Sequence, residues 1–371
     1  MSDTPTMNSR QLEQFVGISA KMRENVLIVG PPGCAKSAVV KKTAEEIRMN
    51  LIHVHACTSD PCDVKGYPTT VDSPITGEKE ADFLPFGDMR EMMYADKPTI
   101  VFLDDFGTAA VSVQVGYMQI IQERRLNSYK ISDHIRFVLA TNRASDKAGA
   151  NQGIIETIKG RAAIVAVEPD VDGWCRYVSK YGVADYHDAP MDACPPLLLA
   201  FARFMDSKKD NLFNFTPSKI VDEQSCTPRN LSRLGRYMNK YEKEGLGEEE
   251  NLYGLGRTGS FGIIGAVQGQ RLCAFAKTVS KLPSLKEIVS DPLGTPVPVE
   301  PNQLFALNGW LIGKADLKNF DEISQYVVRW SPEFRALFVN DISMMREELL
   351  SHDGFDRLAA ATTDVALGSV R

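Results

Sequence analysis

The sequence lacks three features that would place it in other classes of protein. It holds 7 cysteines in 371 residues, and no two of them form a CxxC pair. An odd, scattered set of this kind indicates neither a disulfide framework nor a zinc site. No uninterrupted apolar run approaches the ~18 residues of a membrane-spanning helix, and the first ten residues carry no basic-then-apolar signal pattern. Together these absences predict a cytoplasmic protein with no membrane segment.

Positive charge is not in excess either. The chain has 42 Lys and Arg against 48 Asp and Glu, a net charge of −6. This balance argues against a broadly basic nucleic-acid coat, although a local basic groove is compatible with it. What the chain does have is 43% hydrophobic and 24% charged residues, which are ordinary globular values and exclude wholesale disorder. At about 150 residues per domain, the length suggests two to three domains.

The first 170 residues alternate between segments typical of strands and of helices. Short apolar runs at 25–30, 99–105 and 134–142 predict buried strands, and the alternating segment 51–56 predicts another strand. Residues 9–22 predict an amphipathic helix with Ser9 as its cap. Such an alternation predicts an α/β core with a mostly parallel sheet and helices on its faces. Residues 66–86 carry turn residues between two β-prone arms, which predicts a hairpin inserted into this core.

The remainder of the chain has a helical pattern. Helical spacing over 171–245 predicts a helical domain, and the charged, glycine-containing segment 244–251 predicts a linker. Residues 250–371 also have helical spacing, interrupted by proline-rich segments, and predict a further helical region. We therefore expect three domains, over 1–170, 171–245 and 250–371.

The strongest motif is GPPGCAKS at 30–37, between the first strand and a helix predicted at 37–49. This is the arrangement of a P-loop, in which backbone N–H groups hold phosphate oxygens at the positive end of the helix. Lys36 would supply a charge to the β and γ phosphates of ATP, and Ser37 a hydroxyl to Mg²⁺. The expected nucleotide-binding residues are Gly30, Pro31, Pro32, Gly33, Cys34, Ala35, Lys36 and Ser37.

One position departs from the usual P-loop pattern. The residue before the lysine is ordinarily glycine, and here it is Ala35. Glycine is needed only where φ is positive, so a methyl group fits if Ala35 already has helical dihedrals.

Two later strands end in polar side chains suited to the same chemistry. In the segment 99–107, four apolar residues directly precede Asp104 and Asp105. We expect Asp104 to hold Mg²⁺ through water, Asp105 to orient the attacking water, and Asn142, at the end of the next strand, to hold that water or touch the γ-phosphate. Many such ATPases have Glu where Asp105 stands. Because Asp is shorter by about 1.5 Å, hydrolysis is expected to be slow unless the backbone compensates.

Three further features have a functional and a structural interpretation. Arg161 follows a short helix, and Arg229 follows Thr227 and Pro228, which predict a cap and the first turn of a helix that would aim Arg229 at an anion. On the residues alone, each arginine is better explained as a surface ion pair. His53 and His55 alternate on a predicted strand and share one face, but without an evident third ligand they are better explained as core or edge residues than as a metal pair.

The motifs GPPGCAKS, FLDDFG, ATNR, IKGR and CTPRN, in this order, resemble those of an AAA+ ATPase. The GPPGxAKS form of the loop, and DPCDVKGYP at 60–68 with a hairpin after it, resemble the MoxR-type branch. The resemblance covers about residues 9–240 and implies a P-loop NTPase core of three layers followed by an α-helical lid. No motif covers residues 250–371.

This resemblance also implies roles and cofactors. The cofactors are ATP and Mg²⁺, and the hairpin at 66–86 is an insert that faces the centre of a ring. The implied roles are Lys36 and Ser37 as Walker A residues, Asp104 and Asp105 as the Walker B pair, Asn142 as sensor 1, Arg161 as an arginine finger acting on a neighbouring subunit's nucleotide, and Arg229 as sensor 2 on the lid.

The partners follow from the same resemblance. The family forms homo-oligomeric rings, usually hexamers, and MoxR-type members are thought to act as chaperones that remodel proteins, often ones with a von Willebrand factor A domain. A DNA-directed AAA+ motor or loader is an alternative that the acidic balance weakens. A second alternative is a nucleotide-gated scaffold that binds ATP and barely hydrolyses it. This alternative depends on Asp105, which stands where Glu is usual.

Overall fold

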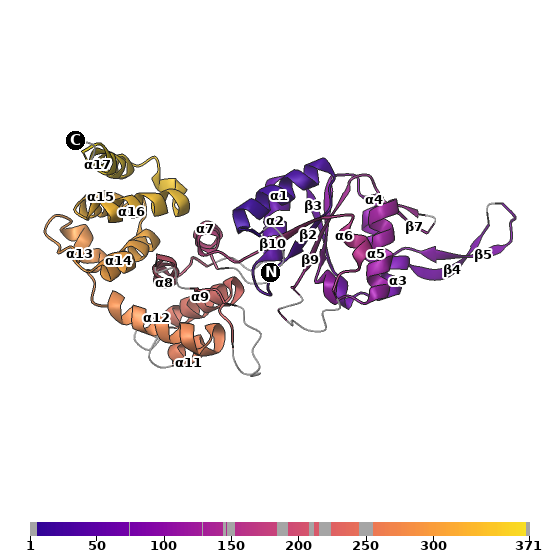
Figure 1. Cartoon of the computed structure of the whole chain (residues 1–371), viewed down its shortest axis with the longest axis horizontal. Helices are drawn as coiled ribbons and strands as arrows, with labels where there is room; N and C mark the ends of the chain where they lie inside the picture. The colour runs from indigo at the N-terminus through magenta and orange to yellow at the C-terminus, as the bar shows by residue number, and fades with distance from the viewer. Residues whose placement is uncertain are drawn as a thin grey trace. The chain divides into compact units, whose positions relative to one another are not determined.

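The computed structural model describes residues 6–73, 75–127, 129–143, 146, 153–183, 192–207, 211–214, 224–244 and 255–368. The chain divides into two compact units, one that ends at Pro169 and one that begins at Asp170. Figure 1 shows strands in the first unit and helices in the second. Within the described residues, none of the helices combines the length and the apolar character needed to cross a membrane. The linker expected at 244–251 lies almost wholly outside the described residues.

The first unit is built on a six-stranded sheet in which every neighbouring pair of strands is parallel. Across the sheet, the strands lie in the order β1 (Thr6–Met7), β10 (Ala163–Val167), β2 (Val26–Val29), β9 (Ile135–Thr141), β6 (Thr99–Asp104) and β3 (Asn50–His55). Strands β6 and β9 are buried along their whole length, since helices cover both faces of the sheet. The predicted parallel sheet is confirmed.

Helices form the two outer layers of this unit (Figure 1). On one face, α1 (Ser9–Met22) and α2 (Lys36–Glu46) enclose a core with Ile28 and Phe102 of the sheet. The other face is covered by α3 (Pro61–Lys65), α4 (Gly87–Tyr94), α5 (Val111–Glu123) and α6 (Glu156–Lys159). The three-layer core is therefore confirmed. Helix α1 is capped by Asn8, whose side chain accepts from the Gln11 amide, and not by the serine that follows it.

A β-hairpin is inserted between α3 and α4, as the turn chemistry predicts. Strands β4 (Tyr67–Asp72) and β5 (Lys79–Leu84) pair antiparallel, with Tyr67 opposite Leu84 and Asp72 opposite Lys79. The hairpin projects from the body of the first unit (Figure 1). A second, smaller ribbon consists of β7 (Arg125–Leu126) and β8 (Tyr129–Lys130).

The second unit is helical in its described residues. Its α-helices are α7 (Val171–Tyr181), α8 (Pro196–Ser207), α9 (Pro228–Lys243), α11 (Leu255–Ile264), α12 (Ala266–Val279), α13 (Leu285–Ser290), α14 (Pro301–Lys314), α15 (Phe320–Val328), α16 (Pro332–Met345) and α17 (Asp353–Gly368). A single apolar cluster runs through this unit, with Phe201, Leu307 and Tyr326 among its fully buried members.

A buried ion pair lies within that apolar cluster. Asp341 accepts hydrogen bonds from Arg203 through two guanidinium nitrogens and from Asn308 Nδ2 at 2.8 Å. Arg203 also contacts Asp172. Burial alone would lower the pKa of Arg203, but the nearby acidic groups, Asp341 foremost, together outweigh burial and raise that pKa. The carboxylate of Asp341 thus compensates a guanidinium charge that burial disfavours.

Candidate functional site

The polar residues expected to act on ATP meet at one edge of the sheet. Strands β2, β9 and β6 are neighbours and parallel, so their carboxyl ends lie together. The loop 30–37 follows β2, Asp104 ends β6, and Asn142 follows β9. Ligands of open α/β sheets bind at this edge, because loops and helix N-termini converge there.

Lys36 lies at the centre of this site. Its ammonium donates to the carbonyl oxygens of Gly30 and Pro31 and to Asn142 Oδ1, each at 3.0 Å. The side chain is only 7% exposed. These three oxygens are neutral acceptors, so they orient the ammonium without neutralising its charge. The loop thus holds a positive charge at the N-terminus of α2, where a phosphate would lie.

Ser37 and Asp104 form the second contact of the site. Ser37 Oγ donates to Asp104 Oδ2 at 2.6 Å, and the Asp105 amide donates to Asp104 Oδ1 at 3.0 Å. Burial acts to raise the pKa of Asp104, but the hydrogen bonds from His53, Ser37 and the Asp105 amide and the charge of His53 together outweigh it, and the pKa lies below its usual value. Asp104 is therefore an ionised carboxylate beside a hydroxyl, a pair of oxygen donors of the kind that Mg²⁺ prefers.

Asp105 and Asn142 form the third contact. Asn142 Nδ2 donates to Asp105 Oδ1 at 3.3 Å, while its Oδ1 accepts from Lys36. The amide of Asn142 thus joins the lysine expected to bind phosphate to the carboxylate expected to orient water. Asp105 itself has φ 50° and ψ 35°, in the left-handed region that Asp and Asn adopt more readily than most residues.

The backbone of the P-loop corrects one expectation. Ala35 has φ 74° and ψ 22°, so it does not have the helical dihedrals that a methyl group was expected to require. The loop turns through positive φ at both Gly33 and Ala35, and the alanine costs roughly 1–2 kcal/mol there. Gly30 is constrained by packing instead. A Cβ on Gly30 would lie 2.5 Å from Val167 Cγ1 on β10.

Arg161 lies at the amino ends of the parallel strands, whereas the P-loop of its own subunit lies at their carboxyl ends. It follows α6, and its guanidinium donates to the carbonyl oxygen of Thr157. Two residues later, Ala163 pairs with Val26, the first residue of β2. The P-loop follows the last residue of that strand. The role of Arg161 on a neighbouring subunit's nucleotide stays a prediction.

Arg229 belongs to the second unit, in the first turn of α9. Thr227 caps this helix by accepting from the Asn230 amide at 3.2 Å, and Pro228 is the first helical residue, as expected from the sequence. The capping residue and the helix both belong to the second unit. The role of Arg229 in sensing nucleotide stays a prediction.

Two further residues border the site: His53, which the sequence led us to explain as a core or edge residue, and Arg143, which sequence reasoning gave no role. His53 Nε2 lies 3.3 Å from Asp104 Oδ2. Arg143, directly after Asn142, pairs with Asp146 at 3.0 Å and with Glu168 just beyond β10. The Arg143 contacts tie the loop after β9 to the strand against which Gly30 packs. Only the position of Arg143 after the strand-ending asparagine could have drawn attention to it.

A glycine-rich loop between strand and helix, a Lys-Ser pair and a strand-ending carboxylate define a P-loop NTPase of the AAA+ class. Residues 4–152 match the family model described as the MoxR domain in the MoxR-vWA-beta-propeller ternary systems. The N-terminal part of the chain is thus similar to the MoxR-type AAA+ ATPases. No curated protein matches the chain.

Two solved structures have a similar chain path. One is the Thermotoga maritima RuvB Holliday junction branch migration motor, at 12% identity and TM-score 0.38, covering 77% of this chain and 75% of that one. Another is NtrX from Brucella abortus in complex with ATP, at 13% identity and TM-score 0.41, covering 94% of this chain and 67% of that one.

Proposed function

We propose that this protein is a Mg²⁺-dependent ATPase that assembles into a homo-oligomeric ring, a hexamer, and remodels a protein partner. The observation that carries the proposal is the connected set of side chains at the carboxyl edge of the sheet. Lys36 reaches Asn142, and Asn142 reaches Asp105. Beside them, Ser37 donates to Asp104. Phosphate-binding, metal-binding and water-orienting groups are thus held within one hydrogen-bonded cluster.

The donor set fits Mg²⁺. Ser37 Oγ and Asp104 Oδ2 are hard oxygen donors 2.6 Å apart, and Asp104 is kept ionised. When bound, Mg²⁺ would neutralise charge on the β and γ phosphates. Ser37 would ligate the ion directly, and Asp104 would hold it through water.

The remaining residues divide the chemistry among them. The amides of the loop and the ammonium of Lys36 would bind and orient the triphosphate. Asp105 and Asn142 would hold the attacking water in line with the γ-phosphate. Arg161 would come from the neighbouring subunit to stabilise charge in the transition state, a contribution of about 10³–10⁵ in rate for residues of this type. Arg229 is proposed to contact the nucleotide from the helical lid.

The proposed partner is a protein with a von Willebrand factor A domain, since the description of the matched family model names such systems. The β4–β5 hairpin is the proposed contact with the remodelled protein. It exposes large apolar side chains, with Tyr67 58%, Ile75 92% and Leu84 59% exposed. Apolar side chains this exposed on a projecting hairpin are suited to gripping another chain.

The experiment that tests the proposal is the ATPase rate per subunit as protein concentration is raised. A site completed by the neighbour's Arg161 requires assembly, so specific activity should climb and then plateau together with oligomer size. Lys36→Ala is the control and should release no phosphate at any concentration. Bound ATP without phosphate release from the parent would contradict the ATPase and favour the nucleotide-gated scaffold.

A further inference from the structure

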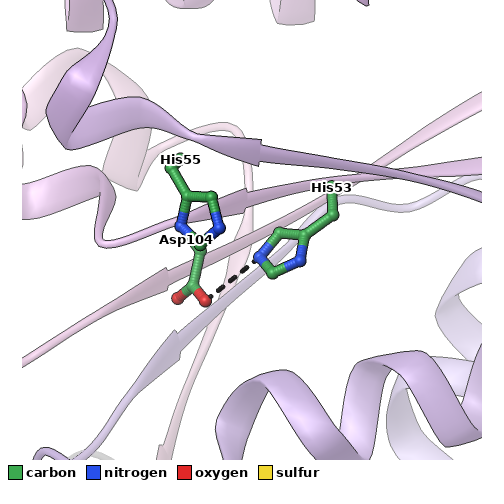
Figure 2. Close-up of side chains that lie close together, drawn as sticks. All are labelled: His53, His55 and Asp104. Carbon is green, nitrogen blue, oxygen red and sulfur yellow. Dashed lines mark hydrogen bonds and ion pairs between the residues drawn. The ribbon is translucent and has the colours of Figure 1, made fainter. Parts of the chain in front are cut away.

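The edge strand of the sheet carries two histidines on one face. In β3, the alternate residues Ile52 and Val54 are buried in the core, so His53 and His55 point to the other face. The parallel register with β6 places His55 opposite Asp104 and His53 opposite Phe102. Figure 2 shows the three polar side chains gathered together, with His53 linked to Asp104. The third ligand that the sequence could not supply is therefore brought by the neighbouring strand.

The geometry is close to that of a metal site. His53 Nε2 lies 3.3 Å from Asp104 Oδ2, and the rings of His53 and His55 are 4.4 Å apart between centroids. One ligand atom from each of the three residues lies within 4.8 Å of the other two. In a tetrahedral zinc site with bonds near 2.0–2.2 Å, ligand atoms are about 3.3 Å apart. The His53–Asp104 edge already has this length, and the exposed His55 ring needs to move by roughly 1.5 Å at most.

We propose that His53, His55 and Asp104 bind a divalent transition-metal ion of the zinc type, with the fourth position open to water. Two imidazoles and one carboxylate are the ligands of open zinc sites, whereas Mg²⁺ and Ca²⁺ select oxygen donors. The site is also reachable, because both histidine side chains are exposed on β3, the last strand of the sheet among the described residues.

The site shares a ligand with the nucleotide site. Asp104 Oδ2 is both the oxygen that faces His53 and the acceptor of the Ser37 hydroxyl at 2.6 Å. An ion held by the two histidines and Asp104 removes that carboxylate from Ser37 and from Mg²⁺. Transition-metal binding therefore inhibits ATP hydrolysis. This consequence rests on the proposed ATPase function, whereas the metal site itself does not.

Binding is tested first on the full chain without nucleotide, after removal of metals by a chelator. Because Cys57 and Cys62 are exposed and could bind zinc themselves, both are replaced by serine in every variant. The probes are Co²⁺, followed by visible absorption, and Zn²⁺, followed by titration calorimetry. His55→Ala removes one ligand without altering a partner of Asp104. His134→Ala is the matched control, since His134 is also exposed on the first unit.

The expected result is one Zn²⁺ per subunit, intense tetrahedral Co²⁺ bands, and an affinity at least tenfold weaker in His55→Ala than in His134→Ala. Equal affinity in these two variants, or no binding at micromolar Zn²⁺, would overturn the site. Phosphate release then tests the coupling, and Zn²⁺ should inhibit the His134→Ala protein at least tenfold more strongly than His55→Ala. Histidine-dependent binding with equal inhibition would overturn the coupling. A protein that binds zinc but never hydrolyses ATP would contradict only the proposed function.

Discussion

Lengthening Asp105 to glutamate is expected to slow ATP hydrolysis, although glutamate is the usual residue at this position. The backbone of Asp105 is left-handed, at φ 50° and ψ 35°, a conformation that suits Asp better than Glu. Its Oδ1 already lies 3.3 Å from Asn142 Nδ2. An added methylene moves the carboxylate by about 1.5 Å. Since a misplacement of ~1 Å can cost ~10²-fold in rate, kcat should fall by roughly 10- to 100-fold, or about 1.4–2.7 kcal/mol.

The assay is steady-state phosphate release at saturating Mg²⁺ and ATP, at a protein concentration where specific activity has reached its plateau. Asp105→Asn is the matched variant. It keeps the shape and the backbone preference but removes the charge, so kcat should fall by at least about 10²-fold while ATP binding is unchanged. A higher kcat in Asp105→Glu than in the parent, at equal ATP affinity, would refute this reasoning. It would show that side-chain length limits the rate.

Three other predictions follow from the same structure. Arg161→Ala should leave ATP binding within about twofold of the parent and stop hydrolysis. Mixing it with Lys36→Ala subunits should recover activity, because those subunits still supply Arg161 to a neighbour. No recovery after subunit exchange would contradict a role between subunits. Ala35→Gly should stabilise the first unit by about 1 kcal/mol, because it relieves the positive φ at some cost in chain entropy; an unchanged or lower Tm would contradict the left-handed backbone. Asp341→Asn should destabilise the second unit by about 3 kcal/mol in urea, since it leaves Arg203 buried without its main counter-charge. Replacing both partners by Leu and Met should cost less, and an equal cost would argue against the ion-pair explanation.

Much of the fold and of the nucleotide site could be predicted from the sequence because the signals are local. Apolar runs buried on both faces predict parallel strands, and the turn residues at 73–77 predict the hairpin. The P-loop is a contiguous segment, so Lys36 and Ser37 are recognisable without any tertiary information. Asp104 and Asn142 follow from the rule that parallel strands end at a common edge.

Local signals failed where conformation or register decides. The residues before Lys36 do not distinguish a helical Ala35 from a left-handed one, because the path of the whole loop sets the φ angle of Ala35. Likewise, the cap of α1 falls one residue earlier than expected, at Asn8. Helix caps shift by one residue with small changes in backbone geometry.

The sequence by itself determined the class of this protein, since phosphate binding depends on neighbouring residues of one loop and on the strands that flank it. Only the tertiary structure decided which distant side chains meet. The register of β3 against β6 turned two edge histidines and Asp104 into one cluster, and a shift of one residue would have separated them. Contacts between side chains of different strands depend on strand order and register. These are set by residues far apart in the chain, and only when the core packs.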